Sequence, residues 1–375
     1  MPEAFIILTF VLVACGMLMI YSSSVFYAQD AYRDPLYFFK REVMWVFAGL
    51  CAALVARYVH YQTVQKHSGT LLLCATVMLG LVFVPGIGHE VNNASRWLRV
   101  AGFTFQPSEF AKIAIIIFVA DRLARERRHV SQFMRGVCVP LVMIGVPLGL
   151  ILVEPDLGTP IVIMATVFAL FYVGGTKLWH LIVMGACGIP VVAALIIRYP
   201  FRMRRLMTFM NPDADPLGAG FQIRQSLIAV GSGQINGVGL GKSVQKIHYL
   251  PEAHTDFVYA IAGEELGFVG AGAIIILFIA FLTVMYRLSR MVHDMFGHLV
   301  IVGVMTMIGL QTIINIGVVT GCLPTKGIAL PFISYGGSSL VMTLAMCGFV
   351  VNIVENQARL RVEQTRSRSN PATVV

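Results

Sequence analysis

One aspartate, Asp256, stands in the segment YLPEAHTDFVYAIAGEELGF, where a long polar stretch gives way to an apolar run. The dipole of a helix that begins here favours the ionised carboxylate, while partial burial opposes ionisation. The balance of the two effects could leave a usable general base. The alternative is that Asp256 only caps the helix. Two turns deeper, Glu264 and Glu265 must be paired, protonated or hydrated if the run crosses a membrane.

A second charged pair lies within another apolar run. Glu109 and Lys112 are three residues apart, so on a helix they share a face and can form an ion pair. Charges within a membrane span are costly and usually face the interior of a bundle or a pathway. The pair could simply fix helix packing, or Lys112 could bind a carboxylate or a phosphate.

Two carboxylates, Glu154 and Asp156, occupy the segment EPDLGT between two apolar runs. Carboxylates this close could form an acid/base pair or bind a cation. Asp156 could instead cap the helix that follows it.

Three arginines, Arg202, Arg204 and Arg205, cluster in FRMRRLMTF. Guanidinium groups match phosphate oxygens in geometry, so this cluster could hold a diphosphate, or it could anchor the chain to lipid head groups. Residues 221–230 are predicted to form a short amphipathic helix on the membrane surface. The glycine-rich GVGLGK lacks the Walker spacing of a phosphate loop. The histidines do not have the spacing of a metal site, so we expect no bound transition metal.

The elements that position these residues must be membrane helices. Of the 375 residues, 57% are hydrophobic and only 13% are charged, against about 25% charged in soluble domains. Mean hydropathy is +0.78. The net charge of +9 is scattered between apolar stretches rather than gathered in a polar domain, which argues against nucleic acid and favours anionic or phosphorylated lipids. The seven cysteines form no CxxC, and no disulfide framework is expected.

A bilayer core requires about 20 apolar residues per helix. The first run is predicted to be a retained span rather than a cleaved leader. We therefore predict an all-α integral membrane protein with about ten transmembrane helices, near residues 4–26, 42–60, 68–85, 107–124, 137–153, 157–175, 177–199, 256–286, 295–320 and 338–356.

Orientation follows from the basic residues of the short loops. If the N-terminus is cytoplasmic, the inside loops and tail carry fourteen Lys and Arg residues and the short outside loops carry six. Both termini are therefore predicted to be cytoplasmic, and the long 200–255 loop between spans seven and eight is predicted to be extracytoplasmic. We expect one membrane domain, residues 1–358, followed by a basic cytoplasmic tail, residues 359–375.

With this topology, most of the unusual polar segments fall on the external side. Glycine and proline are frequent in them, and irregular backbone at membrane depth is tolerated only where protein buries it or water reaches it. The pattern predicts a cavity that opens outward.

Five segments together closely resemble the SEDS family (shape, elongation, division and sporulation), in order and at family spacing. They are QPSEFAK, EPDLGT, QSLIAVGSG, YLPEAHTDFVYAIAGEELG and LPTKGIALPFISYGGSS. The resemblance covers nearly the whole chain. The last segment is more similar to the division and sporulation members than to the elongation member.

This resemblance implies a ten-helix fold and a peptidoglycan glycosyltransferase that polymerises lipid II on the outer face of the bacterial cytoplasmic membrane. The family's essential aspartate corresponds to Asp256, which would act as general base on the acceptor sugar. The conserved glutamate and lysine correspond to Glu109 and Lys112, and the arginine of the first external loop corresponds to Arg96. We expect the departing diphosphate to be stabilised by Lys112, Arg96, Arg204, Arg205 and Lys246. We further expect Glu154, Asp156 and Ser338 to contact the substrate.

The same resemblance implies a class B penicillin-binding protein as transpeptidase partner, together with other division proteins at the septum. A divalent cation, Mg²⁺ or Mn²⁺, could bridge the diphosphate, although the sequence contains no dedicated cage for it. Two other functions stay open: a lipid II flippase, and a non-catalytic scaffold for cell division.

Overall fold

The computed structural model describes residues 1–91, 94–100, 103–127, 129–154, 156–211, 218–247 and 249–369. Its elements are helices and one small sheet, in the following order: α1 (Pro2–Tyr32), α2 (Tyr37–Tyr58), α3 (Tyr61–Lys66), α4 (Ser68–Leu81), β1 (Gly88–Val91), β2 (Ala94–Val100), β3 (Phe103–Phe105), α5 (Pro107–Arg125), the π-helical turn η1 (Phe133–Cys138), α6 (Val139–Val153), α7 (Gly158–Val173), α8 (Leu178–Arg198), α9 (Pro200–Met210), α10 (Ala219–Ser232), α11 (Val258–Met291), α12 (Met295–Val319) and α13 (Gly337–Ser369).

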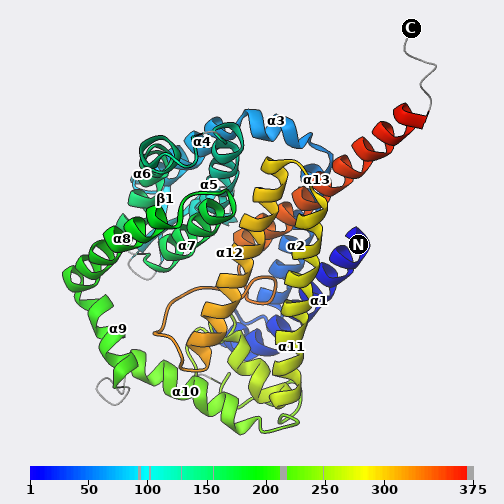
Figure 1. Ribbon diagram of the computed structural model, residues 1–375. Coiled ribbons are helices and arrows are strands. Elements are labelled where there is room, and N and C mark those ends of the chain that lie inside the picture. The colour runs from blue at the N-terminus through cyan, green and yellow to red at the C-terminus, as the bar shows by residue number, and fades with distance from the viewer. Residues whose placement is uncertain are drawn as a thin grey trace.

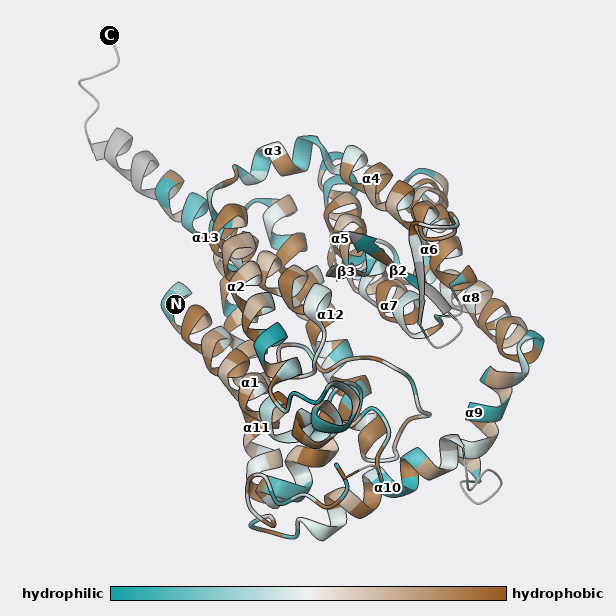
Figure 2. Cartoon of the chain, turned by 180° about the vertical axis from the view of Figure 1, so that it is seen from behind, coloured by the Kyte–Doolittle hydropathy of each residue, from teal (hydrophilic) through white to brown (hydrophobic). Residues whose placement is uncertain are grey.

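Six helices of the described chain are long and apolar enough to cross a membrane: α1, the continuous segment η1–α6, α8, α11, α12 and α13 as far as Leu360. Side chains such as Phe47, Trp179 and Ile276 are exposed on the outside of the bundle, and Figure 2 shows how widely hydrophobic residues cover the helices. Apolar residues all round a helix are typical of a membrane span. The chain is a multi-pass membrane protein.

Helices occupy all ten apolar runs predicted from the sequence. Beyond the six long apolar helices, α4 and α7 are apolar but shorter, and α2 and α5 carry charged residues. The number of crossings therefore stays a prediction. So do the orientation and the boundary at residue 358, because α13 continues to Ser369 without a break.

The helices form two groups that meet at α12 (Figure 1). One group contains α1, α2, α11, α12 and α13, and the other contains α4 to α8. Helix α5 is buried along most of its length and contacts α4, α7, α12 and α13. Helices α2 and α13 pack closely because Gly348 has no side chain: an added Cβ would lie 2.1 Å from the Ala53 carbonyl oxygen.

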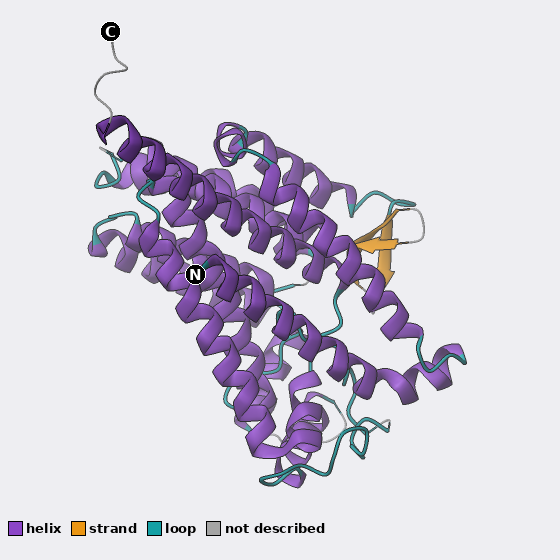
Figure 3. Cartoon of the chain, turned by 90° about the vertical axis from the view of Figure 1, so that its right-hand side faces the viewer, coloured by secondary structure: helices purple, strands orange, loops and turns teal. Residues whose placement is uncertain are grey.

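Two features differ from the sequence prediction. The segment 88–105 contains a three-stranded antiparallel sheet in the order β1-β2-β3, with Leu98 opposite Phe105 (Figure 3). The chain is otherwise helical, as predicted, and this small sheet is the feature that the sequence prediction did not include. The predicted long loop is also partly helical: α9 was not predicted, whereas α10 confirms the helix expected at residues 221–230.

Helix α11 is interrupted at Gly267, which has φ of +66°. The segment 234–239 lies against this break. The amides of Val238 and Gly239 donate to the carbonyl oxygens of Glu264 and Glu265, and the Phe268 amide donates to the Gln234 carbonyl oxygen. These bonds satisfy backbone groups that the break would leave unpaired. They also fix the first two turns of α11, which directly follow Asp256.

Candidate active site

A cavity of about 900 Å³ lies at one end of the bundle. It is lined by residues of segments far apart in the sequence, including β2, the start of α5, the start of α7, α9, the loop before α11 and the loop between α12 and α13. The opposite end is held by other contacts, such as the ion pair between Arg57 and Glu355 at 2.7 Å. The cavity therefore lies at one end of the molecule, while its predicted position on the external side of the membrane stays a prediction.

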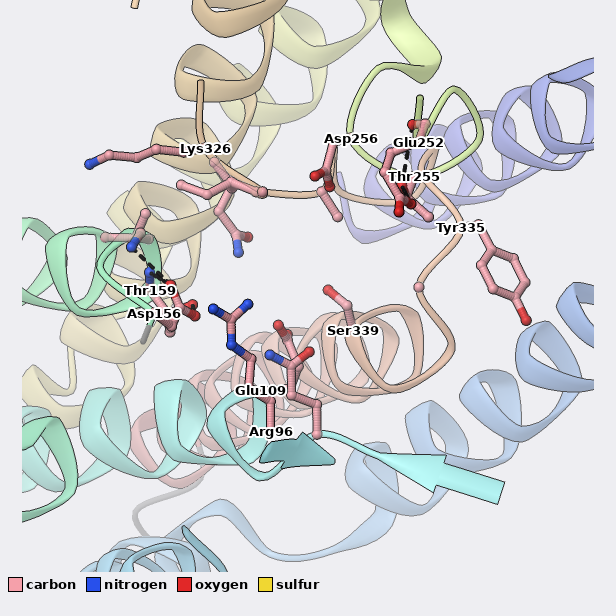
Figure 4. A pocket seen from close by; sticks show the side chains of 18 of the residues that line it. Arg96, Glu109, Asp156, Thr159, Glu252, Thr255, Asp256, Lys326, Tyr335 and Ser339 are labelled. Atoms are coloured by element: carbon pink, nitrogen blue, oxygen red, sulfur yellow. Dashed lines mark hydrogen bonds between the residues drawn. The ribbon is translucent and has the colours of Figure 1, made fainter. Parts of the chain in front are cut away.

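Asp256 lines this cavity, two residues before α11 begins at Val258. In Figure 4 its carboxylate lies on one wall, while Arg96, Glu109 and Ser339 lie on the facing wall. Within the described chain, no donor forms a hydrogen bond with this carboxylate, and the first turn of α11 has no side-chain cap. Asp256 is thus not the helix cap that the sequence left open as its alternative role.

The surroundings of Asp256 raise the pKa of its carboxyl group towards neutrality. Protein atoms enclose the carboxylate closely, although solvent still reaches it from the cavity. This desolvation is the largest cause that raises the pKa of Asp256 to about 7. The negative charge of Glu252 raises it further, and Arg205 and Arg96 oppose the shift. A carboxyl group with a pKa near the working pH is suited to proton transfer.

Glu109 and Lys112 form the predicted ion pair, with Lys112 Nζ 2.8 Å from one carboxylate oxygen and 2.9 Å from the other. Both residues are buried and both line the cavity. Helix α5 begins with Pro107 in its first turn, which places Glu109 at the positive end of the helix dipole. Because Glu109 already neutralises Lys112, the pair contributes little net charge to the cavity.

Asp156 both lines the cavity and caps α7. Its carboxylate accepts hydrogen bonds from the amides of Gly158 at 2.9 Å and Thr159 at 3.1 Å, and from the Thr159 hydroxyl at 2.6 Å. The capping role predicted as one alternative is therefore confirmed.

Glu154 lies behind the wall and does not line the cavity. Its carbonyl oxygen accepts a hydrogen bond from Arg96 Nε at 2.9 Å, which positions Arg96. Burial, and then the charge of Asp156, raise the pKa of the Glu154 carboxyl to about 8, against the opposing effect of Arg96.

Helix α9 directs the three clustered arginines to different sides, so that only two of them line the cavity. Arg202 and Arg205 are three residues apart on α9 and both line the cavity, whereas Arg204 is exposed and does not line it. Arg202 is 6% exposed, lies over the rings of Tyr199 and Phe201, and has two guanidinium nitrogens without a hydrogen-bond partner among the described residues. The sequence placed Arg202 in the cluster but named only Arg204 and Arg205 as residues that stabilise the diphosphate, because the helical spacing within this segment was not recognised.

The loop between α12 and α13 and the start of α13 also line the cavity, and they contribute Lys326 and Ser338. The hydroxyl of Ser338 accepts a hydrogen bond from the Gln106 amide at 3.2 Å, so Ser338 joins α13 to the start of α5. Lys326 was not among the predicted site residues, although its PTKG segment was noted. Burial lowers the pKa of Lys326, and Asp156 partly offsets that effect.

Lys246 does not line the cavity. Its ammonium group is 2.7 Å from a Glu265 carboxylate oxygen and 3.2 Å from the Ser22 hydroxyl, and it is almost completely buried. Glu264 accepts hydrogen bonds from the Ser243 hydroxyl and, at 3.0 Å, from the Val244 amide. Glu265 is therefore ion-paired and Glu264 is hydrogen-bonded. These contacts give Lys246 a structural role away from the cavity.

Comparisons with known proteins agree with this architecture. The family of cell cycle proteins that includes FtsW, RodA and SpoVE matches residues 3–359. A probable peptidoglycan glycosyltransferase FtsW from a Geobacter species is 39% identical over 94% of this chain and 96% of its own length. The stage V sporulation protein E of Bacillus subtilis is 40% identical over 93% of this chain and 95% of its own length.

Solved structures show the same fold. A chain from a study of the structural coordination of polymerization and crosslinking by a peptidoglycan synthase complex matches with a TM-score of 0.77 and 26% identity, over 94% of this chain and 97% of that one. The rod shape determining protein RodA of Thermus thermophilus matches with a TM-score of 0.70 and 25% identity, over 94% and 96%. This chain therefore belongs to the SEDS family, the family of FtsW, RodA and SpoVE, and several of its relatives carry the name FtsW.

Proposed function

We propose that this chain is a peptidoglycan glycosyltransferase that polymerises lipid II, with Asp256 as its general base. The observation that carries the proposal is the Asp256 carboxylate, which faces a cavity rich in basic residues and has a pKa of about 7. The relatives named peptidoglycan glycosyltransferase FtsW, about 40% identical over most of the chain, support the same activity.

The proposed reaction is a single displacement. Asp256 takes the proton from the 4-hydroxyl of the GlcNAc in the acceptor lipid II. That oxygen forms a bond to the anomeric carbon of the donor MurNAc, and the bond from this carbon to the diphosphate oxygen breaks. The polyprenyl diphosphate leaves with the electron pair, and the configuration of the anomeric carbon is inverted. The chain needs one base and one means of stabilising the leaving group.

The charges around the cavity are suited to an anionic leaving group. Its described lining contains six basic side chains and four acidic ones. Lys112 and Glu109 neutralise one another, so the remaining positive charge comes from Arg41 and from four further residues that would bind the leaving group. These four are Arg96, Arg202, Arg205 and Lys326. Charge-assisted hydrogen bonds from such groups strengthen as the diphosphate separates, which is the general route to stabilising a transition state of this kind.

A divalent cation, Mg²⁺ or Mn²⁺, would have few ligands from the protein. Within the described residues, no three His, Cys, Asp or Glu side chains are grouped as a metal site, and the oxygens of Asp156 already accept hydrogen bonds from α7. A bound cation would therefore take most of its ligands from the diphosphate. It would add positive charge beside the leaving group.

We place the protein in the bacterial cytoplasmic membrane at the division septum, with both termini cytoplasmic and the cavity on the outer side, where lipid II is consumed. The membrane domain would end near residue 358 and the basic tail, residues 359–375, would face the cytoplasm. A class B penicillin-binding protein is the proposed partner, with other division proteins. The likeness to a chain of a peptidoglycan synthase complex supports a partner of this type.

A flippase would need a polar path to the opposite end of the bundle. There the Asn352 amide donates to the carbonyl oxygens of Ala56 and Arg57 and joins α13 to α2, and none of these residues lines the cavity. The geometry therefore favours the enzyme.

The deciding experiment supplies lipid II to the full-length purified protein, with and without a class B penicillin-binding protein, and analyses the products for glycan chains. Glycan polymer is the expected result. Translocation of lipid II without polymer would establish a flippase. If the protein showed neither activity, the non-catalytic scaffold would be the remaining function.

A further inference from the structure

The side chain of Asn315 joins two segments of the cavity wall. Asn315 lies near the end of α12 and is 2% exposed. Its amide nitrogen donates hydrogen bonds to the carbonyl oxygens of Asp256 and Ile328, both at 2.8 Å. Both acceptors are carbonyl oxygens, so only the amide nitrogen of Asn315 can face them.

The two bonded segments contact one another at the reactive carboxylate. Ile328 follows Lys326 and Gly327, and a Cβ added to Gly327 would lie 3.0 Å from Asp256 Oδ2. The backbone at Gly327 therefore lies directly against the carboxylate. Figure 4 shows Asp256 and Lys326 on the same wall of the cavity.

The position of the Asp256 side chain depends on its backbone. The carboxylate receives no hydrogen bond within the described chain, and its residue precedes α11. Its own amide bonds only within the local turn, to the Glu252 carbonyl oxygen at 3.2 Å. The bond from Asn315 is the one that connects the Asp256 backbone to α12, within the described residues.

We propose that Asn315 is a positioning residue that fixes the Asp256 backbone relative to the segment 326–328, and so holds the proton acceptor at a set place in the cavity wall. This inference rests on the proposed function. The Asn315 side chain does not line the cavity, so it acts through the two backbone segments. One amide group donates the hydrogen bonds to both segments, so its loss would release both of them. A shift of a catalytic group by about 1 Å can lower the rate by about 10²-fold.

The test compares the full-length native protein with Asn315→Leu, which keeps nearly the same shape but donates no hydrogen bond. Initial rates of glycan formation are measured against lipid II concentration, beside the melting temperature. We expect kcat to fall by about 10- to 100-fold while KM for lipid II changes by less than about threefold, because substrate contacts are retained.

Thr312→Val is the matched control. Thr312 is also buried on α12, one turn earlier, but its hydroxyl donates to the Ile308 carbonyl oxygen of the same helix. This variant should keep native kcat and KM. A loss equal to that of Asn315→Leu would show a general effect of removing a buried polar group from α12, and would overturn the proposal.

Gly327→Ala perturbs the same contact from the other segment and decides the matter if Asn315→Leu does not fold. Its methyl group would press on Asp256 Oδ2, and we expect lower kcat with unchanged KM. A native kcat in folded Asn315→Leu would overturn the positioning role. If only Gly327→Ala folds, a native kcat in that variant would overturn it. A rise in KM with unchanged kcat would overturn it as well. If the native protein itself made no glycan, the proposed function would fail first, and the two failures are thus distinguishable.

Discussion

The substitution Asp256→Asn tests the proposed base directly. It preserves the size of the side chain and removes the ionisable group. Because the carboxylate forms no hydrogen bond within the described chain, we expect the variant to fold and insert normally. General-base help is worth about 10²- to 10⁴-fold, which is about 3 to 6 kcal/mol of the activation barrier at about 1.4 kcal/mol per factor of ten. Asp256→Asn should therefore make little or no glycan.

The pH dependence of the native rate gives a second signature of the same group. Desolvation, and then Glu252, raise the pKa of Asp256 to about 7. Only the ionised carboxylate can accept a proton, so the rate should rise with pH and level off above about 8. One unit below the pKa, only about a tenth of the carboxylates are ionised. Glycan synthesis at pH 6 should thus run at roughly a tenth of its plateau rate.

Stability changes in the opposite direction over this range. A carboxyl group whose pKa is raised on folding stabilises the protein fully below its unfolded pKa, and that contribution is lost as pH rises through the folded pKa. For Asp256 the loss extends from about pH 4 to about pH 7. A rate that increases while this contribution to stability decreases cannot be a consequence of better folding.

The assay measures glycan chains formed from lipid II between pH 5.5 and 8.5, with the melting temperature recorded at each pH. Asp34→Asn is the matched control, because Asp34 is paired with Lys40 at the surface and lies outside the cavity. It should behave as the native protein. In Glu252→Gln, one cause of the raised pKa is absent, so the rise in rate should move to lower pH. Native activity in Asp256→Asn, or a native rate independent of pH, would refute the reasoning.

Three further predictions follow from the other charged residues. Lys112→Ala should abolish glycan synthesis and lower the melting temperature, because an unpaired buried Glu109 costs about 3 to 5 kcal/mol; adding Glu109→Gln should restore the melting temperature but not the rate, and recovery of both would remove Lys112 from the reaction. Arg205→Gln should reduce kcat/KM for lipid II in steady-state kinetics, whereas Arg204→Gln should not, and equal losses would contradict the division of the cluster by α9. Lys246→Met should lower the thermal stability of the purified protein, because Glu265 would be buried without its cation, and an unchanged melting temperature would contradict that structural role.

Much of this architecture follows from local pattern. Long apolar runs require membrane helices because a bilayer leaves no other way to satisfy the backbone, and helices stand at all ten predicted runs. The pairing of Glu109 with Lys112 also follows from sequence, because residues three apart on a helix must share a face. The capping role of Asp156 could be named as an alternative for the same local reason.

Other features depended on contacts between segments far apart in the chain. The sequence could not separate Lys246 from the cavity, because its partners Glu265 and Ser22 come from α11 and α1. It could not select Arg202 over Arg204 without the helical path of α9.

The sequence alone determined that Asp256 stands where a polar segment enters a membrane helix. Only the tertiary structure decided that its carboxylate does not cap α11 and faces a cavity. Burial and the opposing charges of Glu252 and Arg205 then set its pKa. Those charges act through space rather than along the chain, and the fold alone brings Arg205 to Asp256.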